Sequence, residues 1–202
     1  MVFGSMWIIW IFFCISTVNF SVLINKSLTG FFSTQKGLRQ GDPLSPYLFI
    51  LAMEGLSQLL ARAKELQWIQ GFQVGSNPAT TVNVSHLLYA DDTIIFCGAD
   101  KQQVSNLNTT LIVFEAISGL YINMLKSVIY PVNQVDNLVE LAGILSCKIG
   151  SLPTTYLGLP LGASFISSGI WNGVIKKMKR DLLHGKCSTS QWEVGSLSST
   201  VY

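Results

Sequence analysis

The chain has 202 residues, of which 49% are hydrophobic and only 12% are charged, and its formal net charge is +2. This composition excludes a disordered protein, and the length allows one domain with a sizeable core. The small net charge does not by itself indicate a nucleic-acid-binding protein, so the distribution of basic residues along the chain matters more.

The first apolar stretch, residues 6–15, could be mistaken for a signal peptide or a membrane span. Its ten residues are fewer than the roughly 17 that a bilayer-spanning helix needs, and no basic segment precedes it. We therefore predict a buried helix here. Residues 18–24 then largely alternate in hydropathy, and residues 31–34 form a second such stretch after a turn, which predicts two strands.

A glycine-bounded loop comes next, with the sequence GLRQGDPLSP at residues 37–46. Gly41 lets backbone approach a ligand closely, and the cation of Arg39 can meet phosphates. Asp42 suits the cap of the helix that follows, and apolar residues recur at spacings of three and four from residue 44 to about 65. An ordinary loop leading into a helix is the alternative interpretation.

Two adjacent acids, Asp91 and Asp92, lie between apolar stretches rich in β-branched and aromatic residues. We predict strands over residues 81–88 and 93–98, with the acids at the tip of a hairpin. Neighbours on a regular strand point to opposite faces, so adjacent carboxylates converge on one site only where the chain turns. They repel each other unless a cation such as a divalent metal neutralises them. A polar turn without a metal is the alternative.

Further elements follow on both sides of the acids. We predict a strand over residues 67–74 and a helix over residues 100–117 that ends at Gly119. The apolar stripe of that helix consists of Val104, Leu107, Leu111 and Phe114. The remaining predictions are a strand or extended stretch over 120–130, a helix over 136–145, a Gly/Pro-punctuated turn over 156–162 and a basic helix over 170–183.

Basic residues concentrate near the end of the chain. Residues 148–186 contain six lysines and arginines and a single acid, Asp181. Such a patch is typical of a surface near phosphates, and a solvated helix face is the alternative. Residues 185–202 are polar and serine-rich, and we predict a disordered tail there.

Cysteine and histidine give no metal-binding pattern. Cys14, Cys97, Cys147 and Cys187 are far apart and form no CxxC pair, which argues against structural zinc and does not require an oxidising compartment. Cys14 and Cys97 lie in apolar stretches and are predicted to be small core residues. His86 is isolated, and we interpret it as a hydrogen-bonded strand residue rather than a catalyst.

Taken together, these motifs are similar to a known family. The sequence GLRQGDPLSPYLFIL at residues 37–51, followed by YADD at residues 89–92, resembles the palm of a reverse transcriptase. The resemblance is closer to the non-LTR (LINE-type) retrotransposon enzymes of plant genomes. It continues through residues 114–127 and 156–162 in the family's order and covers roughly residues 1 to 183.

This resemblance implies an α+β fold. Residues 1–165 would form an incomplete polymerase palm, an antiparallel sheet with helices packed on one face, which lacks the fingers and the first catalytic strand. Residues 166–184 would begin a helical thumb, and residues 185–202 would be an unrelated tail. Family members often carry Gly at the position of Lys26, so we expect a turn there that is either strained or different from the family's.

The resemblance also implies roles for individual residues. Asp91 matches the family's principal metal ligand and Asp92 its neighbour, in a transfer of nucleotides to a primer that uses two Mg²⁺ ions. The positions that match nucleotide- and template-binding residues are Arg39, Gln40, Gly41, Tyr89 and Lys126, the last of which is alternatively a plain surface lysine. The hairpin that grips the primer is matched by Tyr156, Leu157 and Gly158. The implied partners are an RNA template, a DNA primer and dNTPs, with no membrane.

A third metal-binding aspartate of the family is expected on a strand upstream of residue 3. Residues 1–41 contain no Asp and no Glu. With one of three acids missing, we expect very weak or no polymerase activity from this chain alone. We expect an intracellular product of unknown compartment, in the nucleus, the cytoplasm or a mitochondrion, that is not secreted.

Four hypotheses follow from the sequence. The chain is a truncated reverse transcriptase domain from a retroelement, or a non-catalytic nucleic-acid-binding module that keeps the palm. Alternatively, residues 6–15 attach a small protein to a membrane. In the fourth hypothesis the chain does not fold stably, because a missing strand exposes sheet edges and apolar faces.

Overall fold

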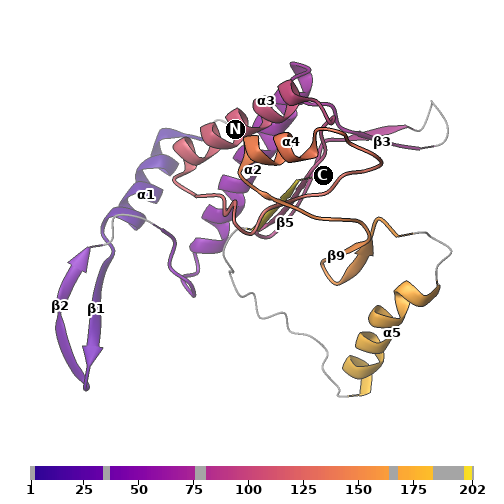
Figure 1. The fold of residues 1–202 in the computed structure, drawn as a ribbon. Helices are drawn as coiled ribbons and strands as arrows, with labels where there is room; N and C mark the ends of the chain where they lie inside the picture. Colours follow the sequence, from indigo (N-terminus) through magenta and orange to yellow (C-terminus); the bar gives the residue numbers. More distant parts are fainter. Residues whose placement is uncertain (1–2, 34–36, 76–80, 164–167, 184–197, 202) are drawn as a thin grey trace. The chain divides into compact units, whose positions relative to one another are not determined.

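The computed structural model describes residues 3–33, 37–75, 81–163, 168–183 and 198–201 (Figure 1). The chain divides into two compact units, Met1–Asp42 and Pro43–Tyr202.

The first unit consists of one helix and one hairpin. Helix α1 (Ser5–Ser16) is followed by the antiparallel strands β1 (Asn19–Ile24) and β2 (Ser27–Ser33). The predicted helix and two strands are present, but β2 begins at Ser27, inside the segment predicted as a turn. The turn between the strands places Asn25 at φ 50° and Lys26 at φ 69°. A side chain at positive φ is strained, so the strain expected at Lys26 is present.

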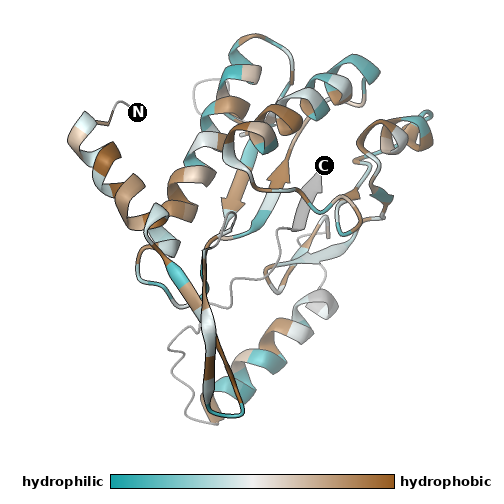
Figure 2. Cartoon of the chain, turned by 90° about the vertical axis from the view of Figure 1, so that its left-hand side faces the viewer, coloured by the Kyte–Doolittle hydropathy of each residue, from teal (hydrophilic) through white to brown (hydrophobic). Residues whose placement is uncertain are grey.

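The predicted burial of α1 is wrong within the described residues, because no residue of this helix is buried. Figure 2 shows the helix next to the N-terminus coloured predominantly hydrophobic. A helix that is apolar all round needs partners on every side, and the unit offers only a two-stranded hairpin. Cys14, predicted to be a core residue, is exposed for the same reason. Among the described helices, none combines the length and the apolarity needed to cross a membrane.

The second unit contains the longer helices. They are α2 (Ser45–Glu65), α3 (Lys101–Ser118), α4 (Leu138–Leu145) and α5 (Ser168–Leu183), each within a few residues of its prediction. Asp100 caps α3 by accepting a hydrogen bond from the Gln103 amide, and Gly119 ends it at φ 70°. The predicted cap at Asp42 is wrong, because α2 begins at Ser45 after Leu44 and has no side-chain cap.

The central sheet has the strand order β5-β6-β11-β7-β8. Its strands are β5 (His86–Tyr89), β6 (Asp92–Ile95), β11 (Ser198–Val201), β7 (Val128–Ile129) and β8 (Lys148–Ile149). Only β5 and β6 pair antiparallel, so the antiparallel sheet expected from the resemblance is a mixed sheet here. The physical reason is that α3 and α4 return the chain in the same direction before β7 and β8, as helical crossovers do.

Two small antiparallel sheets accompany the central one. Strand β3 (Phe72–Val74) pairs with β4 (Val82–Val84), and β9 (Thr154–Tyr156) pairs with β10 (Leu159–Leu161). The strands predicted over residues 67–74 and 120–130 are thus much shorter than the apolar stretches that suggested them.

The core lies between α2, α3, α4 and one face of the central sheet. All four residues of the predicted α3 stripe are buried, with exposed fractions of 2% or less. They pack with Ile95 of β6 and Ile129 of β7. Because alternate strand residues face the same way, Thr93 shares the helix-facing side with Ile95, whereas Asp92 and Ile94 face the other side.

The tail is described only over residues 198–201. These residues form strand β11 inside the central sheet, which differs from the disordered tail that composition predicts. The rest of the predicted tail lies outside the described residues. Ser, Thr and Val in an extended segment are compatible with a strand, and the sheet supplies the pairing that local composition does not reveal.

Candidate active site at the tip of the β5–β6 hairpin

The two acids lie at the tip of a tight hairpin. Tyr89 of β5 pairs with Asp92 of β6, so Ala90 and Asp91 form a two-residue turn. Ala90 has φ 51°, and the first central residue of a primed hairpin turn (type I′ or II′) has such a positive φ. The prediction that Asp91 and Asp92 lie at a hairpin tip is therefore confirmed.

Both carboxylates are partly exposed. Asp92 is the first residue of β6 and points to the sheet face opposite the core helices, as the alternation with Thr93 and Ile95 requires. Asp91 is in the turn itself. The pair is thus accessible to a ligand at one end of the central sheet.

The β9–β10 hairpin reaches this site through Tyr156. Burial raises the pKa of the Tyr156 phenol, and the negative charge of Asp92 raises it further. The Tyr156 hydroxyl is buried and has no hydrogen-bond partner among the described residues. The charge of one predicted metal ligand, Asp92, thus acts on one predicted primer-binding residue, Tyr156.

Leu157 and Gly158 form the two-residue turn of this hairpin. Their φ angles are 51° and 79°, and Tyr156 pairs with Leu159 across the turn. Lys177 of α5 lies close by, since its Nζ is 3.7 Å from where a Cβ on Gly158 would lie. The turn predicted for this segment is confirmed, and a basic helix accompanies it.

Lys126 lies at the same end of the central sheet as the acids. Val128 of β7 and Ile94 of β6 are level with each other, because both pair with Thr200 of the parallel strand between them. Lys126 precedes Val128 by two residues, as Asp92 precedes Ile94, and its side chain is exposed. The register thus brings a cation to the acidic end of the sheet.

The predicted template-binding loop belongs to the first unit. The Asp42 amide donates a hydrogen bond to the Arg39 carbonyl at 3.3 Å, which closes a turn around Gln40 and Gly41. Gly41 has φ 86°, which suits glycine. The Arg39 guanidinium lies over the Phe20 ring, 5.3 Å from its centroid. Within that unit these residues form a turn with an anchored cation, and the acids belong to the other unit.

His86 has a structural role, as predicted. Its Nε2 lies 2.9 Å from Ser57 Oγ and its Nδ1 2.9 Å from Ser85 Oγ, which connects β5 to α2. Burial lowers the pKa of His86, the charge of Lys64 lowers it further, and Glu54 opposes this in part. A neutral ring hydrogen-bonded at both nitrogens is well suited to connecting two elements.

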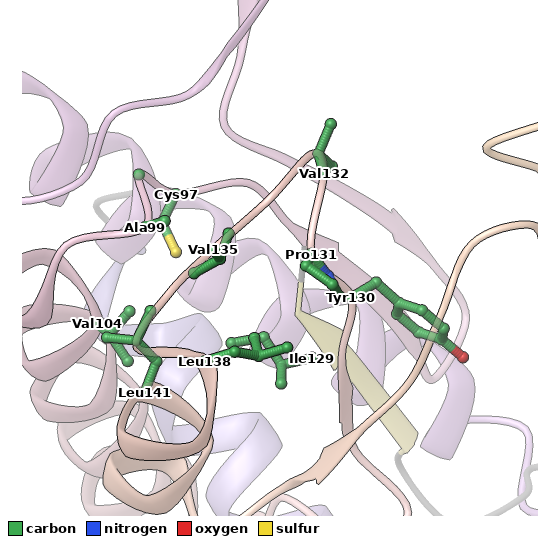
Figure 3. Close-up of a pocket in the computed structure, with 11 residues that line it drawn as sticks. Cys97, Ala99, Val104, Ile129, Tyr130, Pro131, Val132, Val135, Leu138 and Leu141 are labelled. Atoms are coloured by element: carbon green, nitrogen blue, oxygen red, sulfur yellow. The ribbon is translucent and has the colours of Figure 1, made fainter.

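An apolar pocket of about 110 Å³ lies at the opposite end of the central sheet (Figure 3). Its walls follow the ends of β6 and β7 and include Cys97, Val135 and Leu141, while the phenol of Tyr130 points away from it. Burial raises the pKa of the Cys97 thiol to about 11, so this thiol is protonated and is a poor nucleophile. The described lining of this pocket therefore provides no reactive group comparable with the two acids at the other end of the central sheet.

The two carboxylates at the hairpin tip are ligands of the kind that Mg²⁺ takes in proteins. This ion usually takes one or two carboxylates and completes its shell with water and substrate phosphates, so Asp91 and Asp92 fit one such ion. No group of three His, Cys, Asp or Glu residues suited to a metal occurs in the described part of the chain. The pair therefore fits a substrate-dependent site better than a preformed metal cage.

Comparison with known proteins places the chain in a family. The sequence pattern of the reverse transcriptase (RNA-dependent DNA polymerase) family matches residues 2–161. The chain therefore belongs to the reverse transcriptase family. It is also similar to an uncharacterized mitochondrial protein of Arabidopsis thaliana, with 49% identity over 71 residues, 35% of this chain and 56% of the relative. The match thus spans just over half of that relative's length, and no solved structure matches the chain.

Proposed function

We propose that the chain is palm sequence from the reverse transcriptase of a plant non-LTR (LINE-type) retroelement, and that Asp91 and Asp92 are two carboxylates of its metal site. The observation that carries the proposal is the tight turn, which holds two adjacent, accessible acids at one end of the central sheet. The family match over residues 2–161 supports the same chemistry.

In this function a primer 3′-hydroxyl attacks the α-phosphate of a nucleotide. Bound Mg²⁺ would activate the hydroxyl and stabilise the leaving oxygen. Asp91 and Asp92 would hold the ion, and Tyr89, with 54% of its surface exposed, offers an aromatic face beside them. Lys126 would place a positive charge near the triphosphate.

In this proposal the hairpin that carries Tyr156 positions the primer at the metal site formed by the acids. The charge of Asp92 acts on the Tyr156 phenol, which relates the β9–β10 turn at Leu157 and Gly158 to the acids. A primer held by this turn would therefore have its end near the carboxylates. Positioning of this kind supplies a large part of the rate in phosphoryl and nucleotidyl transfer.

We also propose that these 202 residues alone have very low polymerase activity. Residues 1–41 contain no acid, and the described residues contain no group of three potential ligands. In this proposal Asp91 and Asp92 alone would hold a metal ion weakly, which is the reason for the low activity.

Primer extension on an RNA template tests this proposal. We expect the chain to give little or no incorporation with Mg²⁺, and Asp91→Ala to give none. Incorporation that Asp91→Ala abolishes would support the polymerase assignment and contradict the predicted inactivity. Incorporation that survives Asp91→Ala would contradict the assigned site.

A non-catalytic nucleic-acid-binding function is the second candidate. One observation favours it, namely that the basic helix α5 runs beside the β9–β10 turn, with Lys177 close to Gly158. A gel shift with a primer–template duplex should weaken steeply between about 50 and 200 mM salt, as expected for binding to phosphates. The double variant Lys176→Glu, Lys177→Glu should reduce the salt slope by about 2, because each lysine that binds a phosphate contributes about 1 to the slope. Lys26→Glu, in the other unit, is the control and should bind as the wild type does.

The relative from Arabidopsis thaliana is described as mitochondrial. We extend this to the present chain as a proposal, with the mitochondrion as its compartment. Fractionation of plant cells with an antibody against the chain would test it, and recovery in the nuclear fraction alone would contradict it.

A further inference from the structure

One strand of the central sheet comes from a distant part of the sequence. Strand β11 lies between β6 and β7 and runs parallel to both (Figure 1, yellow). In the described residues β6 and β7 do not pair with each other, and α3 connects them. Without β11, one edge of β6 and one edge of β7 would therefore present unpaired backbone groups.

These strands are buried while β11 is in place. Thr93, Ile94 and Ile95 have exposed fractions of 2%, 1% and 0%, and Ile129 has 5%. Without β11 the backbone N–H and C=O groups along both edges would lose their strand partners. A strand in the position between β6 and β7 therefore completes the sheet.

Recognition of the strand is provided by the backbone. The register matches Ser198 to Asp92 and Val201 to Ile95 on one side, and Thr200 to Val128 on the other. A parallel ladder forms through main-chain groups, which are identical in every copy of the chain. The ladder thus cannot distinguish the chain's own strand from the same segment of another copy.

The segment between α5 and β11 is long enough for β11 of one copy to pair with β6 and β7 of another copy. Fourteen residues, 184–197, separate α5 from β11. Fully extended, they span up to about 50 Å, so the strand is tethered at an effective concentration of the order of millimolar. A competing strand therefore needs a concentration of similar order to displace it.

We propose that the gap between β6 and β7 is a strand-acceptor site, which residues 198–201 fill within one chain and which the same residues of a second copy fill by exchange. The partner is thus a second copy of this chain, and the contact is strand addition inside a sheet. This inference does not depend on polymerase chemistry, because it rests on strand pairing alone.

The test uses a fluorescent peptide with the sequence of residues 195–202. We expect the full wild-type chain to bind it weakly, because its own strand occupies the site. The full-length variant Thr200→Pro should bind it at least about tenfold more tightly, because proline removes an N–H of the competing strand. Thr200→Val, which keeps the N–H, is the matched control and should bind as the wild type does.

A peptide that carries the same Thr200→Pro change should not bind any of these chains. Equal binding of both peptides, or equal binding of the peptide by wild type and Thr200→Pro, would overturn the proposal.

Wild-type protein supplies a readout that does not depend on the proline variant folding. Amide hydrogen exchange should show protection at Asp92–Ile95 and at Val128, and analytical ultracentrifugation should show dimers near millimolar concentration that free peptide dissociates. Rapid exchange at these amides, or a chain that stays monomeric at such concentrations, would overturn the proposal as well.

Discussion

The negative charge of Asp92 acts on the phenol of Tyr156, which relates the β9–β10 hairpin to the acidic turn. Burial raises the pKa of Tyr156 above its ordinary value of 10.0, and the charge of Asp92 adds to the increase. Two motifs more than 60 residues apart in sequence are thereby brought to one place.

Removal of the Asp92 charge should lower the pKa of Tyr156. We expect Asp92→Asn to move it toward 10.0 without reaching that value, because burial is the larger cause. Tyrosine ¹³C NMR titration measures it directly. Asp91→Asn is the matched control and should leave the titration unchanged, and an identical effect of both changes would contradict a specific effect of the Asp92 charge.

His86 should make the folded state less stable in mild acid. Its pKa is lowered in the folded chain from an ordinary 6.5, so the unfolded chain binds the proton more readily. The contribution of neutral His86 to stability is therefore present above pH 6.5 and is lost as the pH falls through the lower, folded pKa. Urea unfolding at about pH 7.5 and about pH 5 should show this loss, and His86→Gln should reduce it. The same pH dependence in His86→Gln would refute this assignment.

Thr93 carries a buried hydroxyl that has no hydrogen-bond partner among the described residues. Replacing it with a methyl group in Thr93→Val should raise the free energy of unfolding by about 1–2 kcal/mol, because an unsatisfied buried polar group is removed. Thr110→Val is the control. The Thr110 hydroxyl donates to the Asn106 carbonyl, so its loss should cost about 0.5–1.5 kcal/mol. Denaturant unfolding of both variants measures these changes in the free energy of unfolding. A Thr93→Val variant that is less stable than the wild type would contradict the prediction.

Lys26 adopts φ 69° in the β1–β2 turn. We expect Lys26→Gly to stabilise this hairpin by about 1 kcal/mol, since glycine accepts this conformation without strain. Slower hydrogen exchange at the amides of β1 would show it. Ser27→Gly, at the first position of β2, should instead weaken the hairpin by about 0.5–1 kcal/mol. Equal effects of the two changes would show that the turn is not strained.

The sequence predicts best where one local pattern determines the structure. Helix α3 has a stripe of apolar residues and a terminal glycine, and both act in the structure as predicted, whereas its Asp100 cap was not among the predictions. The acidic turn was equally predictable, because adjacent carboxylates between two β-prone stretches leave few arrangements.

Long-range pairing is what the sequence did not predict. Nothing in residues 198–201 indicates that they complete a sheet, because backbone pairing leaves no signature in a short Ser/Thr/Val segment. Burial of α1 was inferred from its apolarity, but burial depends on a partner surface that the first unit does not provide. Of the site, the positions of Asp91 and Asp92 followed from the sequence, whereas the approach of Tyr156 to Asp92 depends on tertiary packing.

The most direct test of the account is metal binding at the hairpin tip. Mn²⁺ is a paramagnetic substitute for Mg²⁺, and its binding to the full chain in the presence of a dNTP can be followed by electron paramagnetic resonance. We predict that Asp91→Asn weakens binding at least about tenfold, because one of the two proposed carboxylate ligands is removed, while Asp136→Asn, outside the hairpin, binds as the wild type does. Equal Mn²⁺ affinity in Asp91→Asn and the wild type would contradict the claim that these acids form a metal site.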